Sequence, residues 1–336
     1  MILKLNIEKL MRGENLESAM LEKALEELLN PEINPLQISA FLVLLHAKGE
    51  TVDELSTMIK TLKKKMIPVP TKHKVLDIVG TGGDGLNTIN ISTGSAILAA
   101  SCGVKIAKHG NRSVSSLTGS ADVLEALGVN IQLTPEQISK SIDQIGIGFC
   151  YSPNFHPTTH ALKKLRKKLN VPTSFNILGP LLNPANVAHN ILGVSNETLM
   201  PTLADVLIQN GSKRSVVAHG IGLDEISCAG PVKIIEINNQ IKTEYIINSE
   251  QFGLARCTVE ALRGSHASIN AEILLDAFKG KRGAVADTLI FNAAFALTIY
   301  GIESSLHEAV SHASDNLFSG SAYQLLKNWV EFSGEK

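Results

Sequence analysis

The fold class is decided by the stretch VLDIVGTGGDG, residues 75–85. Residues 75–79 form a short, apolar, partly β-branched run of the kind typical of a buried strand. The glycines that follow let backbone N–H groups approach phosphate oxygens closely. Residues 90–101 predict a helix, whose N-terminus adds a positive dipole end and the hydroxyls of Ser92 and Thr93. Strand, glycine loop and helix in this order predict a βα unit with an anion-binding loop.

This loop differs from the two common nucleotide-binding loops. It contains Gly-x-Gly-x-x-Gly, but the dinucleotide fingerprint also needs an acidic residue roughly 20 positions on, to hold a ribose hydroxyl. Here the next predicted strand, 104–107, is followed by Lys108. No Gly-Lys-Ser or Gly-Lys-Thr follows, which excludes a Walker loop. A tight βα turn without a ligand is the alternative that the loop alone leaves open.

A second polar loop, KHGNRSVSSLTGS, covers residues 108–120. It leaves the strand 104–107 and enters a predicted helix over 120–127, for which Ser120 is the expected N-cap. Two cations, several hydroxyls and an amide make it a candidate cradle for an anion with many oxygens. His109 either faces the ligand or is an ordinary polar residue without a ligand, and the sequence does not favour one role over the other.

Two further segments carry charge. Asp224 and Glu225 follow the predicted strand 216–218, and adjacent carboxylates beside phosphate loops suit Mg²⁺, which prefers carboxylate and phosphate oxygens. The alternative is two solvated acids on a turn. The segment 156–183 contains a basic helix, most of which we expect to be a solvated face. One arginine of this helix, turned inward, would bind a carboxylate through two parallel N–H groups.

The chain divides into a helical and a mixed part. Helices are predicted over 16–29, 37–47 and 51–65, the last with Thr51 and Glu54 as a capping box. Strands then alternate with helices, which predicts a mostly parallel sheet. Residues 155–185 return to a helical, proline-broken pattern. We therefore expect a small helical domain, 1–72, rejoined by about 155–185, and a larger α/β domain, 73–154 and 186–336.

Composition restricts the class of protein. The 336 residues include 31 Lys+Arg and 32 Asp+Glu, and the net charge of -1 argues against a strongly basic nucleic-acid binder. The four cysteines form no Cys-x-x-Cys pair, so reduced thiols in a cytoplasmic protein are expected. The apolar run 38–45 is far shorter than the roughly 20 residues of a membrane span. We expect neither a membrane nor a nucleic-acid partner.

Together, these loops resemble those of the anthranilate phosphoribosyltransferase family. The resemblance is carried by the segments 77–85, 90–93, 108–112, 175–184 and 223–225. It extends to the segments 37–42, 48–51, 270–271, 292–294 and 320–322, and so covers nearly the whole chain. The departures are small: Ile89 stands where Phe is common, and Pro172 lies at a variable position.

The resemblance implies a nucleoside phosphorylase type II-like fold, a homodimer and Mg²⁺ as cofactor. It also implies the reaction of anthranilate with 5-phosphoribosyl 1-diphosphate, which yields N-(5-phosphoribosyl)anthranilate and diphosphate in tryptophan biosynthesis. Two alternatives stay open. A pyrimidine nucleoside phosphorylase would share the phosphate loops but should lack the complete sequence motifs at 108–112 and 179–184. A non-catalytic nucleic-acid-binding relative should show a basic groove.

The resemblance also assigns site residues. Those implied for phosphoribosyl diphosphate are Gly80, Gly83, Asp84, Thr88, Asn90, Ile91, Ser92, Thr93, Lys108, His109, Gly110, Asn111, Arg112, Ser113, Val114, Ser115, Ser116 and Ser120. Those implied for anthranilate are Gly80, Asn111 and Arg166, with His109 lining the pocket, and those implied for the metal are Ser92, Asp224 and Glu225. No covalent nucleophile is required.

Overall fold

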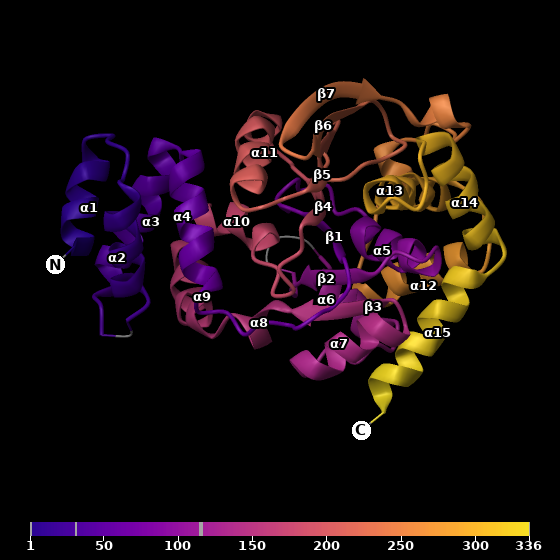
Figure 1. Ribbon diagram of the computed structural model, residues 1–336, viewed down its shortest axis with the longest axis horizontal. Helices are drawn as coiled ribbons and strands as arrows, with labels where there is room; N and C mark the ends of the chain where they lie inside the picture. The colour runs from indigo at the N-terminus through magenta and orange to yellow at the C-terminus, as the bar shows by residue number, and fades with distance from the viewer. Residues whose placement is uncertain (1, 31, 114–116, 336) are drawn as a thin grey trace.

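The computed structural model describes residues 2–30, 32–113 and 117–335. A group of helices at one end is joined to a larger part built on a sheet (Figure 1). The helical group contains α1 (Ile2–Met11), α2 (Ser18–Leu28), α3 (Pro35–Lys48), α4 (Val52–Lys63), α8 (Ser152–Phe155), α9 (Pro157–Leu169) and α10 (Ser174–Leu178), the last followed by a 3₁₀ turn, η1 (Gly179–Leu181).

The sheet has seven strands in the order β3-β2-β1-β4-β5-β6-β7. Strands β1 to β5 are parallel, whereas β6 pairs antiparallel with both β5 and β7. Their bounds are β1 (Leu76–Gly80), β2 (Ile106–Gly110), β3 (Ile147–Tyr151), β4 (His189–Gly193), β5 (Arg214–Gly220), β6 (Val232–Asn238) and β7 (Ile241–Ile247). The sheet is therefore mostly parallel, as the sequence predicts.

Each face of the sheet is covered by its own layer. Alternate residues of a strand point to opposite faces, so Ile191 of β4 packs into one core and Leu192 into another. The first core lies under α5 (Ile91–Ser101), α6 (Ser120–Ala126), α12 (Ala267–Phe278), α13 (Ala284–Tyr300), α14 (Leu306–Phe318) and α15 (Ser321–Gly334).

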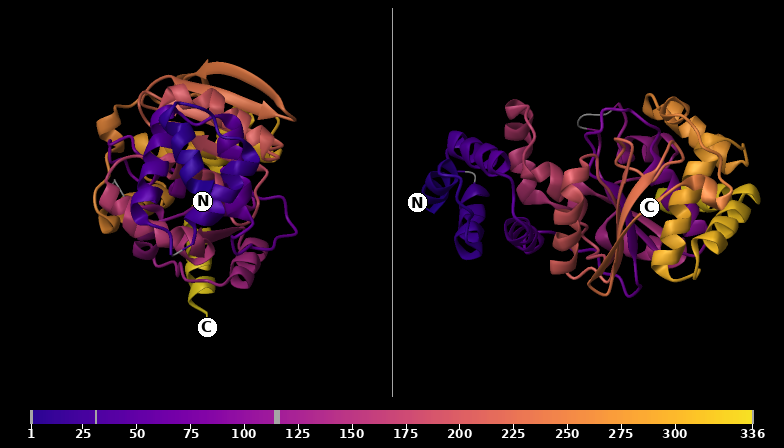
Figure 2. Two further views of the ribbon diagram at one scale, coloured as in Figure 1. Left: turned by 90° about the vertical axis from the view of Figure 1, so that its left-hand side faces the viewer. Right: turned by 90° about the horizontal axis from the view of Figure 1, so that it is seen from above.

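The second core joins α1–α4 to α11 (Met200–Gln209) and to inward residues of α9 and α10. A smaller third core lies between α7 (Pro135–Gln144), β3 and the segment around Val69. Figure 2 shows the sheet between the C-terminal helices on one side and the helical group on the other. In the described part of the chain, no helix is long and apolar enough to cross a membrane.

The helices and strands that the sequence predicts lie within three residues of their observed bounds, but other elements are not predicted. Ser120 is not the N-cap of α6: Gly119 takes that position, and its N–H donates to Asp122 Oδ2 at 2.9 Å. The Ser120 hydroxyl instead donates to the Asn111 carbonyl at 3.3 Å. Strands β3, β4 and β7 and helices α7 and α11–α15 have no counterpart among the predicted elements.

The predicted capping box at the start of α4 is confirmed, and it belongs to a larger buried network. The Thr51 N–H donates to Glu54 Oε2 at 2.8 Å, and the Glu54 N–H donates to Thr51 Oγ1 at 3.2 Å. The same carboxylate accepts Lys48 Nζ at 2.8 Å and the Leu16 N–H at 2.8 Å. Because Glu54 is only 1% exposed, it links three segments of the helical group without competition from water.

We therefore predict that Glu54→Ala lowers the free energy of unfolding by about 3–5 kcal/mol, the cost of leaving a buried partner charge and buried N–H groups unpaired. The matched control is Glu17→Ala, which removes an exposed carboxylate paired with Lys9 at 3.4 Å and should cost less than about 1 kcal/mol. Urea unfolding followed by circular dichroism measures both. Equal losses for the two variants would show that the buried network does not stabilise the helices.

Candidate functional site

Four neighbouring parallel strands end on glycine at one edge of the sheet: β1 at Gly80, β2 at Gly110, β4 at Gly193 and β5 at Gly220. Because the strands are parallel, the loops that leave them gather at the same edge. Three of the four segments that the sequence singles out begin here. The sheet therefore brings both glycine-containing loops and the acidic pair together.

The turn that carries Asp224 fits tightly between β1 and β4. A side-chain carbon on Gly80 or Gly193 would overlap Asp224, so only glycine permits the approach at either strand end. The carboxylate of Asp224 accepts the Gly82 N–H at 2.6 Å. The acidic turn and the first glycine loop are thus fixed against one another.

The same turn holds a strained residue. Gly220 and Leu223 pair as a short bridge, with Ile221 at φ 35° and Gly222 at φ 84° between them. A β-branched residue with positive φ is disfavoured, because its branched Cβ crowds the adjacent backbone. Such strain persists only where the surroundings enforce it. Here it presents the acidic pair directly after the turn.

Lys108 is the cation at the centre of the site, and it is only 1% exposed. Its Nζ donates to the Ile78 carbonyl at 2.7 Å and to Ser92 Oγ at 3.4 Å, which links β2 to β1 and to the first turn of α5. Burial lowers the pKa of Lys108, and the charges of Asp77 and Glu225 oppose this shift. Lys108 therefore has carboxylates on two sides.

The acidic groups outnumber this cation. Burial, followed by repulsion from Asp84, raises the pKa of Asp224 to about 7. Burial and the neighbouring Asp224 raise the pKa of Glu225 well above its ordinary value, while Lys108 and the Ser92 backbone N–H oppose this. Carboxylates that repel one another at the N-terminus of a helix fit a divalent cation between them.

In the described residues, no group of three or more His, Cys, Asp or Glu side chains forms a closed metal cage. Mg²⁺ does not need such a cage, because it is usually bound by one or two carboxylates, water and phosphate oxygens of a substrate.

Asp77 lies behind Lys108 and is fully buried. Its Oδ1 accepts the His109 N–H at 3.2 Å, and its Oδ2 accepts Asn183 Nδ2 at 2.8 Å. Burial raises the pKa of Asp77 to about 6, although the Lys108 charge opposes this. Asn183 also donates to the Ala107 carbonyl at 2.7 Å, so the segment 175–184 is tied to β1 and β2 through this carboxylate.

Sequence reasoning assigns no role to Asp77 or Asn183. The available signal is an acid between Leu76 and Ile78 in an apolar strand, with a lysine in the following strand. A buried acid and a buried base in successive parallel strands indicate charges that act on one another.

Other residues implied for the phosphoribosyl diphosphate site have different partners. Arg112 pairs with Asp122 at 2.9 Å and Glu125 at 2.6 Å, on α6 and away from the glycine loop. The Ile91 side chain is buried in the core, and its N–H donates to the Ile89 carbonyl at 2.7 Å. Ile91 therefore contributes packing at the start of α5. Residues 114–116, which include three of the implied residues, lie outside the described part of the chain.

The remaining implied residues border the same edge of the sheet. Asn90 is the N-cap of α5, and its amide group connects the Thr118 carbonyl at 3.1 Å with Asn270 at 3.0 Å. Thr88 pairs with Arg263 in an isolated bridge. The Asn111 side chain accepts the Arg112 N–H at 2.7 Å. Gly83 lies close to Ser195 Oγ, a hydroxyl that sequence reasoning misses and that donates to the Gly82 carbonyl at 2.9 Å.

Two histidines form a neutral wall near Lys108. The rings of His109 and His156 lie 5.2 Å apart between centroids. Burial, with repulsion from His156 and Lys108, lowers the pKa of His109 to about 3, and burial lowers that of His156 to about 4. The Gly179 backbone opposes the lowering of the His109 pKa, so this ring lies beside η1. Both rings are therefore neutral at neutral pH.

Arg166 on α9 is turned inward, unlike the exposed Lys167 and Lys168 beside it. Its Nη2 donates to Asn176 Oδ1 at 3.2 Å, and its guanidinium carbon lies 5.3 Å from the centre of the Phe175 ring. Its Nε is buried and has no hydrogen-bond partner among the described residues. Arg166 thus keeps unused donors, as an arginine prepared for an anion would.

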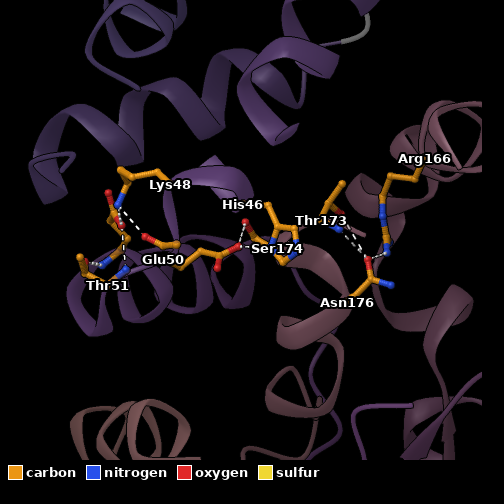
Figure 3. A network of polar contacts seen from close by, with 10 residues as sticks. His46, Lys48, Glu50, Thr51, Arg166, Thr173, Ser174 and Asn176 are labelled. Atoms are coloured by element: carbon orange, nitrogen blue, oxygen red, sulfur yellow. Dashed lines mark hydrogen bonds and ion pairs between the residues drawn. The ribbon is translucent and has the colours of Figure 1, made fainter. Parts of the chain in front are cut away.

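Figure 3 shows how this arginine connects to the N-terminal helices. Asn176 also accepts the Thr173 N–H at 3.1 Å, which holds it toward Arg166. The adjacent Ser174 donates to Glu50 Oε1 at 2.5 Å, and the same oxygen contacts His46 Nδ1 at 2.9 Å. The carboxylate of Glu50 therefore joins the end of α3 to α10, which carries the partner of Arg166.

We predict that Asp77→Asn destabilises the protein by about 3–5 kcal/mol, because Lys108 stays buried and loses its nearest opposing charge. Asp276→Asn is the matched control, since Asp276 is an exposed acid paired with Lys281 at 2.9 Å, and its loss should cost less than about 1 kcal/mol. Denaturant unfolding compares the two variants. An Asp77→Asn protein as stable as the control would show that the charge of this buried carboxylate contributes nothing to folding.

The chain matches two family models. One, described as the helical bundle domain of a glycosyl transferase family, matches residues 6–66, and another, described as the a/b domain, matches residues 72–323. Among curated relatives, the anthranilate phosphoribosyltransferase of Chlamydia felis is 48% identical over 301 residues, covering 89% of this chain and 88% of that protein. The anthranilate phosphoribosyltransferase of Acetivibrio thermocellus is 42% identical, covering 99% and 97%.

Solved structures show the same similarity. The crystal structure of anthranilate phosphoribosyltransferase from Thermus thermophilus superimposes with a TM-score of 0.92 at 37% identity, covering 98% of this chain and 99% of that one. The enzyme from Saccharomyces cerevisiae in complex with PRPP and Mg gives a TM-score of 0.90 at 28% identity, covering 98% and 97%. The expected fold, with its helical and α/β parts, is confirmed.

Proposed function

The chain belongs to the anthranilate phosphoribosyltransferase family, and we propose which of its residues carry each part of that reaction. The enzyme transfers the phosphoribosyl group from 5-phosphoribosyl 1-diphosphate to the amine of anthranilate, a reaction of tryptophan biosynthesis. The resemblance that the sequence indicates is therefore confirmed, ahead of the nucleoside phosphorylase and nucleic-acid-binding alternatives.

The observation that supports the donor site best is the grouping of Lys108, Asp224 and Glu225 at the edge where β1, β2 and β5 end. We propose that phosphoribosyl diphosphate binds here, with its phosphate oxygens on the N–H groups of the glycine loop and on the N-terminus of α5. The hydroxyls of Ser92 and Thr93 lie on the first turn of that helix. Lys108 supplies positive charge from beneath.

The same acids would hold Mg²⁺, as would the Ser92 hydroxyl. The mutual repulsion of Asp84, Asp224 and Glu225 supports this assignment, because an intervening cation removes it. The Saccharomyces cerevisiae relative has been solved with Mg. When bound, the metal neutralises the charge that develops on the diphosphate. Asp224 and Glu225 would hold that metal from the turn that follows Ile221 and Gly222.

We propose that anthranilate binds between the second loop and α10. Arg166 would bind its carboxylate through two parallel N–H groups, and Asn111 would lie near its amine. Gly80 would leave room for the acceptor between them. Binding energy then positions the amine against the ribose carbon, which is the main source of rate when no covalent nucleophile takes part.

The neutral histidines suit this chemistry. Displacement of diphosphate builds positive charge on the sugar ring and negative charge on the leaving group. Stabilisation of the leaving group by fixed donors and cations is then the principal electrostatic effect. Because the pKa of His109 is about 3, its ring adds no cation beside the sugar. His109 would therefore line the acceptor pocket without opposing the developing positive charge.

A direct test is the loss of anthranilate fluorescence on mixing the protein with phosphoribosyl diphosphate and Mg²⁺. Consumption that requires all three components supports the proposal. Turnover of pyrimidine nucleosides with phosphate, without use of anthranilate, would replace it with the phosphorylase alternative.

We also propose that residues 1–72 and about 155–185 form one domain, which closes against 73–154 and 186–336. The contacts that α9 and α10 make with α3 support this division. A homodimer and a cytoplasmic location follow from the family resemblance and, for the location, from four cysteines that are free thiols.

Replacement of the inward arginine separates acceptor recognition from donor recognition. Arg166→Ala should raise the KM for anthranilate about tenfold or more, the effect of losing a charge-assisted hydrogen bond, while the KM for phosphoribosyl diphosphate changes much less. Arg166→Lys should restore only part of the loss. Lys167→Ala, an exposed neighbour on the same helix, is the control and should leave both values unchanged. If Arg166→Ala behaves like that control, another group holds the acceptor carboxylate.

Replacement of the acidic pair tests the metal assignment. Asp224→Asn with Glu225→Gln should abolish Mg²⁺-dependent turnover yet leave the protein folded, because amides keep the size of the side chains and remove the charge that a cation needs. Calorimetric titration of Mg²⁺ in the presence of phosphoribosyl diphosphate measures the loss directly. The exposed acid Glu244, changed to Gln, is the control. Full Mg²⁺-dependent activity in the double variant would place the metal elsewhere.

A further inference from the structure

A second cleft lies at the edge of the sheet opposite the reaction site. Its volume is about 820 Å³, and it is lined by Val75, Ala188 and Lys213, each of which directly precedes a strand. Asn238, at the end of the antiparallel strand β6, closes one side. Since the proposed substrate site lies at the carboxyl ends of the parallel strands, this cleft is separated from it by the length of the sheet.

The cleft carries an excess of positive charge. Lys74, Lys213 and Arg214 line it as permanent cations, together with His189. Glu236, which does not line the cleft, lies 3.6 Å from Arg214, and the lining residue His73 is already paired with Asp143 at 2.6 Å. Burial lowers the pKa of Lys74, and repulsion from the Arg214 charge lowers it further. Burial and these same cations lower the pKa of His189.

Arg214 lines the cleft with a side chain that is 32% exposed. Its Nε is buried and has no hydrogen-bond partner among the described residues. Buried donors are normally paired, and a guanidinium binds phosphate oxygens through parallel N–H groups. Glu236 also accepts the Tyr245 hydroxyl at 3.1 Å through one oxygen, and its other oxygen lies near the Arg214 guanidinium.

The remaining wall of the cleft suits an apolar body. Tyr300 lines it with Ile299 and Pro70, and Lys74 Nζ lies 4.2 Å from the centre of the Tyr300 ring. Lys74 also donates to the Tyr300 carbonyl, while the Tyr300 hydroxyl donates to the Lys74 carbonyl at 2.8 Å. This mutual contact fixes an aromatic face beside the cations.

We propose that this cleft binds a phosphorylated small molecule. The dianionic phosphate lies against Arg214 and Lys213, and the organic body lies on Tyr300. The three cations that line the cleft match a dianion better than a singly charged group, and the guanidinium of Arg214 binds phosphate oxygens directionally.

An occupant of the cleft would affect the reaction site indirectly, through the segments that connect the helical group to the sheet. The wall of the cleft includes Val69 and Ala185, which belong to the connections between the helical group and the sheet. These connections pair with one another, because the Val69 N–H donates to the Pro184 carbonyl at 3.0 Å. A molecule that rigidifies them would change the ease with which the helical group approaches the sheet.

The test uses the whole protein and phenyl phosphate as the probe. The acetylation rate of each lysine by an activated acetate ester is followed by mass spectrometry, in phenyl phosphate and in sodium chloride of the same ionic strength. Phenyl phosphate should slow acetylation of the exposed Lys213 at least threefold. Lys242, paired with Asp205 on the edge strand, should keep its rate. In Arg214→Gln the protection of Lys213 should disappear.

Calorimetry provides a second readout that does not depend on lysine chemistry. Arg214→Gln should weaken phenyl phosphate binding at this cleft about tenfold, whereas Arg263→Gln, an exposed arginine paired with Glu260, should leave it unchanged. Lys213→Gln repeats the measurement if Arg214→Gln does not fold. Equal slowing of Lys213 and Lys242, or protection that persists in Arg214→Gln, overturns the proposal. Neither readout uses anthranilate turnover, so both can fail while the proposed transferase roles hold, and both can succeed while those roles fail.

Discussion

The rest of the site depends on the buried carboxylate of Asp77, which bonds to β2 and to the segment 175–184 and whose charge acts on the buried Lys108. A buried lysine must be near negative charge, because its desolvation otherwise exceeds what the fold can offset. Asp77 meets that need from the neighbouring strand, and its second oxygen fixes Asn183. One carboxylate therefore supports the phosphate-facing cation, positions the segment that reaches η1, and holds the two strands whose ends carry the loops.

Much of the fold follows from local pattern, and the rest depends on long-range packing. The glycine loop after residues 75–79 predicts a strand and a helix, and the structure contains β1 and α5 there. Strand β7 is not predicted, since its residues are mostly exposed and pair only with β6. Helix α13 is missed for the opposite reason: it is apolar on nearly every side and gives no amphipathic period. The predicted N-cap of α6 is wrong by one residue because Asp122 caps the helix from inside.

The sequence predicts the candidate site as a set of loops, but not as a network. Lys108, Asp224 and Glu225 are identified because loop residues with charge stand out in sequence. Asp77 and Asn183 act through buried contacts between segments more than 100 residues apart, for which a single sequence holds no spacing signal. The same applies to Glu50, whose contact with Ser174 links α3 to the segment that holds Arg166. The charge of a loop residue indicates that it contacts a ligand. The topology of the fold determines which buried residues hold that loop residue in place.

The core of the helical group has a consequence for synthesis of the protein. Helices α1–α4 bury Phe41 and Leu42 in a core that includes residues as late in the chain as Leu203 and Ile237. On a ribosome that adds about 5–20 residues per second, these partners emerge on the order of ten seconds after α4 is complete. During that interval the nascent helices expose an apolar face that cannot yet be covered. Helices α1–α4 therefore need protection by a chaperone until their later partners have been made.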